Sequence, residues 1–169
     1  LINSDGDGIP DNQSGTDVEL TYPIADTGQN QCYGEIAMMS CPDVGDYLGQ
    51  DAQYEGTQPS YLGNGDGTVT DLVTGLMWQQ NPNGFVKVKW DDAVADANSI
   101  STGGYGDWRV PTIKELYSLI DFRGDDPSNY QGSDTSGLTP FIDTNYFGFE
   151  YGDESQNERI IDAQYWSNT

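Results

Sequence analysis

The chain has 169 residues, of which 28 are Asp or Glu, six are Lys or Arg and none is His, so its formal net charge is −22. Nucleic-acid binding requires clusters of basic residues along the phosphate backbone, and the lack of such clusters excludes nucleic acids as partners. The same charge disfavours anionic membranes and sulfated polysaccharides. A chain without His also lacks the most frequent general base and the usual zinc ligand, so we expect no catalytic residues and no enzyme activity.

Hydrophobic residues make up only 35% of the chain, but four Trp, eleven Tyr and five Phe provide enough apolar surface for a core. The many Gly and small polar residues favour loops and short strands over long helices. Repulsion among so many carboxylates opposes folding unless cations neutralise them, and acids that coordinate a hard cation are a common reason for such an excess. Alternatively the acids only keep a surface protein soluble, and both explanations can hold together.

Residues 1–17 form a polar segment rich in Asp and Gly, which we interpret as a calcium-binding lead-in. Short oxygen-bearing side chains recur in NSDGDGIPDN at a spacing that lets them surround one Ca²⁺, while a Gly permits the sharp turn. The predicted metal ligands are Asn3, Asp5, Asp7, Asp11 and, through its backbone carbonyl, Ile9. The segment resembles the thrombospondin type 3 calcium repeat. The alternative is a flexible acidic linker that binds no metal.

Cys32 and Cys41 are the only cysteines, and they enclose a loop of eight residues. Neither a CxxC spacing nor cationic neighbours suggest a reactive pair. We therefore predict a disulfide, and with it an oxidising, extracellular compartment; the alternative is two free thiols. The surrounding residues 18–63 show little periodicity, so irregular structure with short strands is expected there.

Residues 67–80 predict two short β-strands around a turn at 71–75. The preceding sequence GNGDGTVTD looks like a second copy of the calcium loop, with Asn64, Asp66 and Asp71 as candidate ligands of a second metal. Asn-Gly and Asp-Gly before an alternating run are also the commonest signals of a hairpin, and we favour a turn without metal. Residues 87–90 are expected to form another short extended piece.

Two helices are predicted, one within residues 90–100 and one within 111–121. The second carries a capping box of Thr112 and Glu115. The predicted apolar faces comprise Trp90, Ala93, Val94 and Ala97 in the first helix and Ile113, Leu116, Tyr117 and Ile120 in the second. The sequence AQYWSNT at 163–169 predicts the beginning of a strand.

Three stretches are similar to the Lcl C-terminal domain family, which is typified by the end domain of a bacterial collagen-like adhesin. They are NGDGTVTDLVTGLMWQQ (64–80), WDDAVADANSISTGGYGDWRVPTIKELYSLID (90–121) and YWSNT (165–169), and the sequence upstream as far as residue 22 also resembles members. The resemblance implies a C-type-lectin-like α+β fold, with two helices, short twisted antiparallel sheets and long loops that carry the function. Such a fold places the four Trp mostly in the core, although sugar stacking is the alternative: Trp78, Trp90, Trp108 and Trp166.

We therefore divide the chain into the calcium-binding lead-in at 1–17 and an Lcl C-terminal domain at 18–169. Members of the family usually continue beyond the Trp-Ser segment with strands that close the sheet, whereas this sequence stops at Thr169. Either a tail has been removed or another polypeptide provides the closing strands. A sheet without its closing strands exposes unpaired N–H and C=O groups that invite strand addition by a partner.

The function we expect is that of an extracellular, calcium-binding, non-enzymatic adhesion or recognition domain of a bacterial surface protein, with a glycan or protein ligand. The alternative is a structural subunit of a calcium-stabilised extracellular filament or pilus, assembled from copies of itself or another subunit. A hydrolase built on paired carboxylates is the third hypothesis, but with 28 acids some pair is always present. For the first two functions the expected cofactor is Ca²⁺, and we expect no insertion into a membrane.

Overall fold

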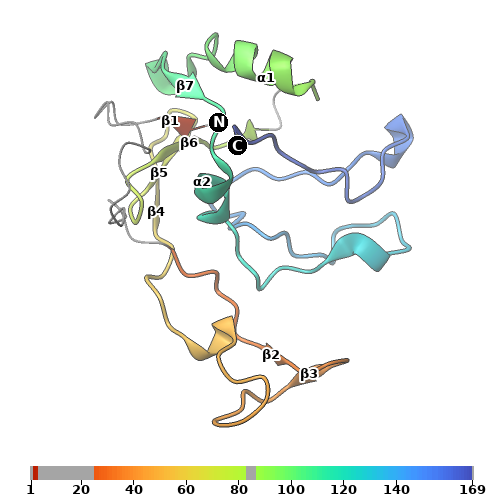
Figure 1. Ribbon diagram of the computed structural model, residues 1–169. Helices are drawn as coiled ribbons and strands as arrows, with labels where there is room; N and C mark the ends of the chain where they lie inside the picture. Colours follow the sequence, from red (N-terminus) through yellow and green to blue (C-terminus); the bar gives the residue numbers. More distant parts are fainter. Residues whose placement is uncertain (1, 4–24, 83–86, 169) are drawn as a thin grey trace.

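The computed structural model describes residues 2–3, 25–82 and 87–168 (Figure 1). The strands are β1 (Ile2–Asn3), β2 (Cys32–Tyr33), β3 (Met38–Met39), β4 (Tyr61–Gly63), β5 (Thr68–Asp71), β6 (Met77–Gln79) and β7 (Trp108–Arg109). The α-helices are α1 (Trp90–Ala97) and α2 (Ile113–Tyr117), and short 3-10 helices are η1 (Asp51–Gln53), η3 (Thr102–Gly104), η4 (Pro127–Asn129) and η5 (Glu154–Gln156). The predicted α+β class, with two helices, short antiparallel sheets and long loops, is confirmed.

The main sheet has the strand order β4-β5-β6-β1-β7, and all neighbouring strands are antiparallel. Strands β4, β5 and β6 form a meander, and its β5–β6 half is the hairpin predicted at 67–80. Ile2 of β1 lies opposite Trp78 of β6 on one side and Arg109 of β7 on the other. The short β1 therefore joins the meander to a strand that is remote in the sequence.

The hydrophobic core of the main part of the chain, here called the body, forms on β5 and β6, where Val69 and Trp78 are directly paired. Phe147, from a loop, completes this buried cluster, and the ring of Tyr61 packs edge-on against Phe147 with centroids 5.0 Å apart. The N–H of Gly148 donates to the carbonyl of Gln80, the residue after β6, at 2.7 Å, which fixes the loop to the sheet. A loop without regular structure thus supplies a third of the buried apolar cluster.

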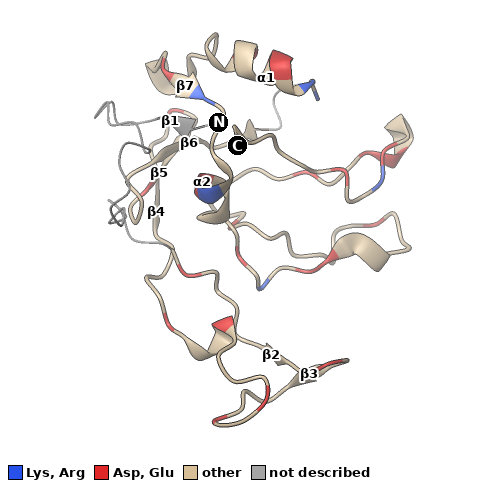
Figure 2. Cartoon of the chain, viewed as in Figure 1, with Lys and Arg blue, Asp and Glu red and all other residues tan. Residues whose placement is uncertain are grey.

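Aspartates hold the loops by accepting a hydrogen bond from the backbone N–H two residues ahead. The N–H nitrogen to carboxylate oxygen distances are 2.7–3.0 Å at Asp26, Asp66, Asp71, Asp121, Asp126, Asp134, Asp143 and Asp153. This is the Asx-turn, in which a carboxylate takes the place of a backbone carbonyl. Figure 2 shows the acids distributed over these loops. Eight of the 28 acids therefore have a local structural role.

These turns also change the acidity of the carboxyls. The hydroxyl of the Ser or Thr two residues ahead, followed by its backbone N–H, lowers the pKa of Asp66, Asp126, Asp134 and Asp153. A lowered pKa in the folded state means that the stabilisation is present at neutral pH and is lost as the pH falls below the ordinary value.

Helix α2 begins with the capping box that the sequence predicts. Thr112 Oγ1 accepts from the Glu115 N–H at 3.3 Å, and a Glu115 carboxylate oxygen accepts from the Thr112 N–H at 2.6 Å. Arg109 of β7 donates two further hydrogen bonds to the same carboxylate, at 2.6 and 2.9 Å. Burial alone raises the pKa of Glu115, but the Arg109 and Thr112 hydrogen bonds outweigh it and the pKa lies below its usual value. This carboxylate thus joins the sheet to the helix.

The predicted burial of the Trp residues is right for two of the four. Trp78 and Trp108 are only 3% and 1% exposed, whereas Trp90 and Trp166 are 41% and 50% exposed, and their assignment to the core is wrong. The indole N–H of each exposed Trp donates to a backbone carbonyl of the other's segment, at 3.0 and 2.8 Å. These rings therefore attach residues 166–167 to the start of α1.

Three local predictions are also corrected. Lys89 is extended, as predicted for 87–90, but it belongs to no strand and Trp90 is already in α1. Residues 163–168 form no strand. Helix α2 is only five residues long, so Ile113 and Tyr117, which the predicted apolar face includes, are 45% and 57% exposed. Leu116 of the same face does pack against the core. A periodic pattern shows which side chains can share a face but not how much of that face a short helix buries.

We expect Glu115→Gln to lower the free energy of unfolding by about 2 kcal/mol at pH 7, because the Arg109 guanidinium loses a charged acceptor. The difference from wild type should shrink as the pH falls through the lowered pKa of Glu115, since the wild-type carboxylate is then protonated. Urea titrations followed by Trp fluorescence at pH 7 and pH 3 measure both effects.

Glu35→Gln is the matched control for this variant, because Glu35 is exposed. An equal loss of stability in the two variants at pH 7 would contradict the role of the Arg109–Glu115 pair.

Candidate functional site

Residues 32–54 form an arm that projects from the body (Figure 1). Strands β2 and β3 pair as a hairpin, with Cys32 opposite Met39, and the Gly34 N–H donates to the Ala37 carbonyl at 2.9 Å within the turn. The rest of the arm is loop and the short η1. So little regular structure cannot by itself hold the arm in one shape.

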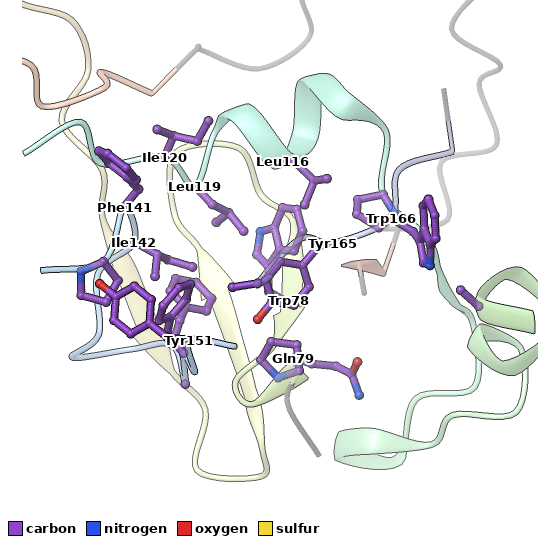
Figure 3. Close-up of a pocket in the computed structure, with 18 of the residues that line it drawn as sticks. Trp78, Gln79, Leu116, Leu119, Ile120, Phe141, Ile142, Tyr151, Tyr165 and Trp166 are labelled. Carbon is purple, nitrogen blue, oxygen red and sulfur yellow. The ribbon is translucent and has the colours of Figure 1, made fainter. Parts of the chain in front are cut away.

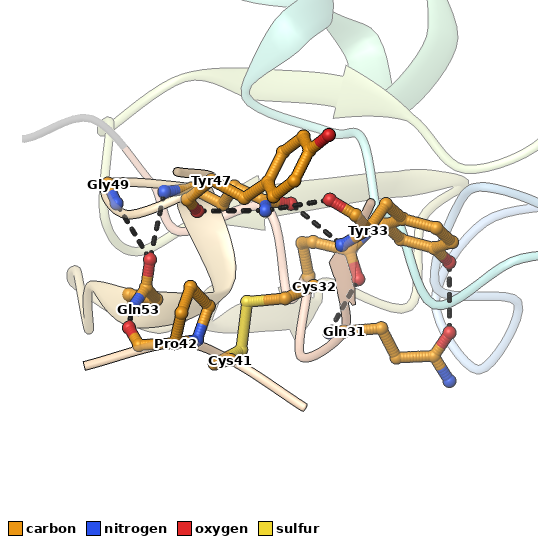
Figure 4. Close-up of a disulfide and its surroundings, with 10 residues drawn as sticks. Gln31, Cys32, Tyr33, Cys41, Pro42, Tyr47, Gly49 and Gln53 are labelled. Carbon is orange, nitrogen blue, oxygen red and sulfur yellow. Dashed lines mark hydrogen bonds between the residues drawn. A yellow bond between two sulfur atoms is a disulfide. The ribbon is translucent and has the colours of Figure 1, made fainter. Parts of the chain in front are cut away.

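Covalent and polar links hold the arm instead (Figure 4). Cys32 and Cys41 are joined in a disulfide, as predicted, and Cys32 is fully buried. The Gln50 side chain donates to the carbonyls of Tyr33 and Tyr47, both at 2.9 Å, and accepts from the Tyr33 N–H at 2.8 Å. One amide group therefore connects the hairpin to the loop that follows it.

Gln53 makes a second link of the same kind. Its side-chain oxygen accepts from the Gly49 N–H at 2.7 Å, and its side-chain nitrogen donates to the Pro42 carbonyl at 2.5 Å. Gly49 has a φ of 90°, which a residue with a side chain rarely adopts, so the loop can close tightly on this amide. The two Gln and the disulfide together replace a hydrophobic core in the arm.

The base of the arm is closed around Asp26. Its carboxylate accepts from the Gly56 N–H at 2.6 Å and the Gly28 N–H at 2.7 Å, and these bonds lower its pKa. The Asp26 N–H donates to the Thr57 carbonyl at 2.8 Å, so the outgoing and returning chains are joined. The Phe122 N–H donates to the Thr27 carbonyl at 2.7 Å and anchors the base to the body.

Apolar and aromatic side chains cover the outside of the arm. Ile36 and Val44 are 98% and 80% exposed, the highest values among the exposed large hydrophobic residues of the described chain. Single exposed apolar residues are normal on a protein surface, but eight in the 22 residues from 33 to 54 are not. They are Tyr33, Ile36, Met38, Met39, Val44, Tyr47, Leu48 and Tyr54. Such a rigid apolar surface is typical of a protein contact site.

The charge of the arm has one sign. Residues 32–55 contain five acids and neither Lys nor Arg: Glu35, Asp43, Asp46, Asp51 and Glu55. A partner surface that fits the arm therefore combines apolar side chains with Lys or Arg.

Of the three residues of the second candidate metal site, Asn64 and Asp66 come together at the Thr68 hydroxyl, whereas Asp71 lies apart from them. Asn64 donates to the hydroxyl oxygens of Thr68 and Thr70, both at 2.9 Å, and Asp66 caps the β4–β5 turn. Asp71 lies at the far end of β5, is 1% exposed and caps the following β5–β6 turn. The turn that we favoured is present, and all three side chains have roles in it or in the next one.

The predicted calcium lead-in falls almost entirely outside the described residues. Asn3 belongs to β1, where its backbone pairs opposite Met77 and Trp108. The other predicted ligands, Asp5, Asp7, Ile9 and Asp11, are not among the residues that the structure describes. Within the described ranges, no three Asp, Glu, Cys or His side chains cluster as a metal site.

The model of the Lcl C-terminal domain matches residues 67–169, more than half of the chain. The chain belongs to the Lcl C-terminal domain family. No curated protein and no solved structure matches it. The matched Lcl C-terminal domain begins at Gly67, in the β4–β5 turn, so the arm precedes it and the resemblance upstream to residue 22 lies outside the match.

The segment W-R-x-P-T-x-x-E-L at 108–116, which lies within the match, has a structural role in this chain. Trp108 is buried, Arg109 pairs with Glu115, and the Pro111 carbonyl accepts from the Asn168 N–H at 2.7 Å. The candidate contact residues lie instead on the arm, where the predictions from the sequence include only the two Cys. The signal for the others is the set of large apolar residues in a segment without periodicity. In the described part of the Lcl C-terminal domain and the arm, no helix is long and apolar enough to cross a membrane.

We expect replacement of both Cys32 and Cys41 by Ser to loosen the arm and leave the body folded. Removing a link around a loop of this size costs about 2–3 kcal/mol, which corresponds to a rise of about 100-fold in local opening. Limited chymotrypsin digestion measures the rate of cleavage within 33–54. All four Trp lie in the body, so unchanged Trp emission is the control for its integrity. Equal cleavage rates in variant and wild type would show that the polar links alone hold the arm.

Proposed function

We propose that this chain is a non-enzymatic adhesion and recognition domain of a bacterial surface protein, which acts outside the cell and binds a protein partner through its arm. The observation that carries the proposal is the apolar surface of residues 33–54, held on a frame of one disulfide and two Gln side chains. A surface fixed before binding loses little conformational entropy when a partner arrives.

Three further features support this proposal. The disulfide suits an oxidising, extracellular compartment. The family is typified by the end domain of a bacterial adhesin, and the matched region, 67–169, follows the arm in the sequence after residues 55–66. The acids around the apolar residues favour protein partners with Lys or Arg at the contact rim over polyanionic ones.

The proposal is tested by replacing the two most exposed apolar residues of the arm together, as Ile36→Ser with Val44→Ser. The probes are a panel of immobilised extracellular-matrix proteins and an array of neutral glycans. We expect the wild-type chain to bind at least one protein probe and the double variant to bind it at least about tenfold more weakly, because the centre of the contact is lost.

Leu72→Ser is the matched control, because Leu72 is 57% exposed but lies in the β5–β6 turn of the body. Retained binding in the arm variant, or binding to glycans alone, would overturn the arm as the protein-contact surface.

Calcium is part of the proposal on the strength of the sequence pattern at 3–11 and the net charge of −22. A bound Ca²⁺ at the start of the chain would reduce the repulsion among the acids. The C-type-lectin-like arrangement and the assembly of the chain into a calcium-stabilised filament likewise remain proposals.

We expect isothermal titration to detect Ca²⁺ binding to the wild-type chain, and Asp5→Ala with Asp7→Ala to remove one ion per chain, because two carboxylate ligands are lost. Asp66→Ala should leave the stoichiometry unchanged, since Asp66 caps a turn. A double variant with the wild-type stoichiometry would refute the loop assignment. Light scattering of the same samples, with calcium and then with EGTA, shows whether the ion also drives assembly.

A further inference from the structure

Tyr47, in the part of the arm that follows the disulfide, has an unusual backbone conformation. Its φ is 68°, in the left-handed region, where the Cβ atom of an L-residue crowds the following carbonyl oxygen. Of the non-Gly residues that the structure describes, only Asn157 shares a positive φ, and Asn tolerates this region better than most residues. For a residue with a bulky side chain, such a φ stores strain.

The strain comes from the turn that contains Tyr47. The Leu48 N–H donates to the Gly45 carbonyl at 3.4 Å, so Tyr47 is the third residue of the β-turn that this bond closes. The second residue of the turn does not have a positive φ, which makes the turn type II, and the third position of a type II turn favours Gly or Asn. Gly45 and Gly49, on either side, have φ values of 87° and 90°. The loop therefore has Gly at two of its three left-handed positions and a Tyr at the third.

Polar contacts within the arm hold Tyr47 in this conformation (Figure 4). The Gln50 side chain donates to the Tyr47 carbonyl and to the Tyr33 carbonyl, both at 2.9 Å. On the other side of the turn, the Gly49 N–H donates to the Gln53 side-chain oxygen at 2.7 Å. A strained conformation persists only where its surroundings impose it, and these contacts do so here.

The turn itself does not require a Tyr, because Gly or Asn would form it with less strain. The Tyr47 ring is 42% exposed, and among the described residues it has no contact with another aromatic ring and no hydrogen bond at its hydroxyl. By contrast, the Tyr33 hydroxyl in the same arm donates to the Gln31 side chain at 2.9 Å. A strained residue whose ring makes neither kind of contact within the fold points to a function of that ring.

The Tyr47 ring does not belong to the apolar cleft of the body either. This cleft has a volume of about 620 Å³, and β6, α1, the end of α2 and the loop segments 140–151 and 160–166 contribute to its walls (Figure 3). None of the arm residues 32–54 lines the cleft. The ring is therefore open to a partner on the contact surface of the arm.

A Tyr ring in this position suits a protein contact. The turn and the Gln50 side chain already fix its backbone, so binding restricts only the two torsions of the side chain itself. Tyr is also one of the residue types that contribute most to the affinity of protein interfaces.

We propose that Tyr47 anchors the protein partner on the arm, and that the strain at its backbone is retained for this contact. The inference rests on the proposed function and deepens it by naming the residue that determines recognition. It requires opposite changes in two properties, because removing the ring and the strain together makes the arm more stable and its binding weaker. A ring with a purely structural role would lower both the stability and the binding.

The stability of the arm is measured by amide hydrogen exchange, which needs no partner. The Tyr33 and Gly49 N–H groups are the reporters, because each donates to a Gln side chain that holds the arm. We expect Tyr47→Asn to slow their exchange about fivefold, since Asn adopts the left-handed region with less strain. Tyr47→Ala should leave the exchange rates within about twofold of the wild type, because its Cβ keeps the strain. Unchanged or faster exchange in the Tyr47→Asn variant would overturn the proposal.

Binding is measured with the same panel of immobilised extracellular-matrix proteins. We expect Tyr47→Asn and Tyr47→Ala each to weaken the binding of the wild-type chain at least about tenfold, because both lose the ring. Tyr47→Phe keeps the ring and should bind within about threefold of the wild type, because at most one hydrogen bond of the hydroxyl is lost. Equally weak binding by the Phe and Asn variants would contradict the ring as the contact.

Tyr105→Asn is the matched control for these substitutions. Tyr105 is 40% exposed, close to the value for Tyr47, but it lies in the body and has an ordinary φ of −87°. We expect this variant to show neither slower exchange at the two reporters nor weaker binding. Equal effects of Tyr47→Asn and Tyr105→Asn would reflect the general loss of a surface Tyr and would overturn the proposal.

The outcomes separate this inference from the proposed function. Binding that is lost in the Ile36→Ser, Val44→Ser variant but kept in Tyr47→Asn would retain the arm as the contact surface and overturn Tyr47 as its anchor. A wild-type chain that binds no protein of the panel would overturn both.

Discussion

The structure depends on the hydrogen bonds that its aspartates accept from nearby backbone N–H groups. Eight Asp side chains fix turns in this way, at positions from Asp26 to Asp153, in a chain with few regular elements. Only six basic residues are present, so most carboxylates have no cation of the chain to pair with. At these eight positions backbone N–H groups bind the carboxylate and order the turn that follows it. The acid excess is thus a means of building loops, whether or not some of the acids also bind metal.

Sequence reasoning succeeded where the determining interaction is local. The capping box of Thr112 and Glu115 lies within one turn, and the β5–β6 hairpin follows from an alternating run beside a turn signal. The disulfide closes a short loop. In each case a few neighbouring residues decide the structure.

It failed where distant segments decide the outcome. The partial exposure of Trp90 and Trp166 depends on contact between the start of α1 and the last residues of the chain, which no local pattern encodes. The cleft arises from the relative placement of a sheet, two helices and two loop segments. The apolar surface of the arm cannot be predicted from the sequence, because apolar residues in an aperiodic segment do not reveal whether they face inwards or outwards.

The base of the arm has a consequence for how this protein can vary. Ala25 and Thr57 form a bridge, and the Asp26 N–H donates to the Thr57 carbonyl at 2.8 Å, so the chain leaves the body and returns to it at one point. Residues 26–56 are therefore a cassette whose two ends are already held together. Its length and sequence can change without any shift in the register of the β4–β5–β6 meander. Surface proteins under selection to alter their contacts can exchange such a cassette while the rest of the fold stays the same. The Ala25–Thr57 bridge also marks the position at which a foreign loop can be grafted.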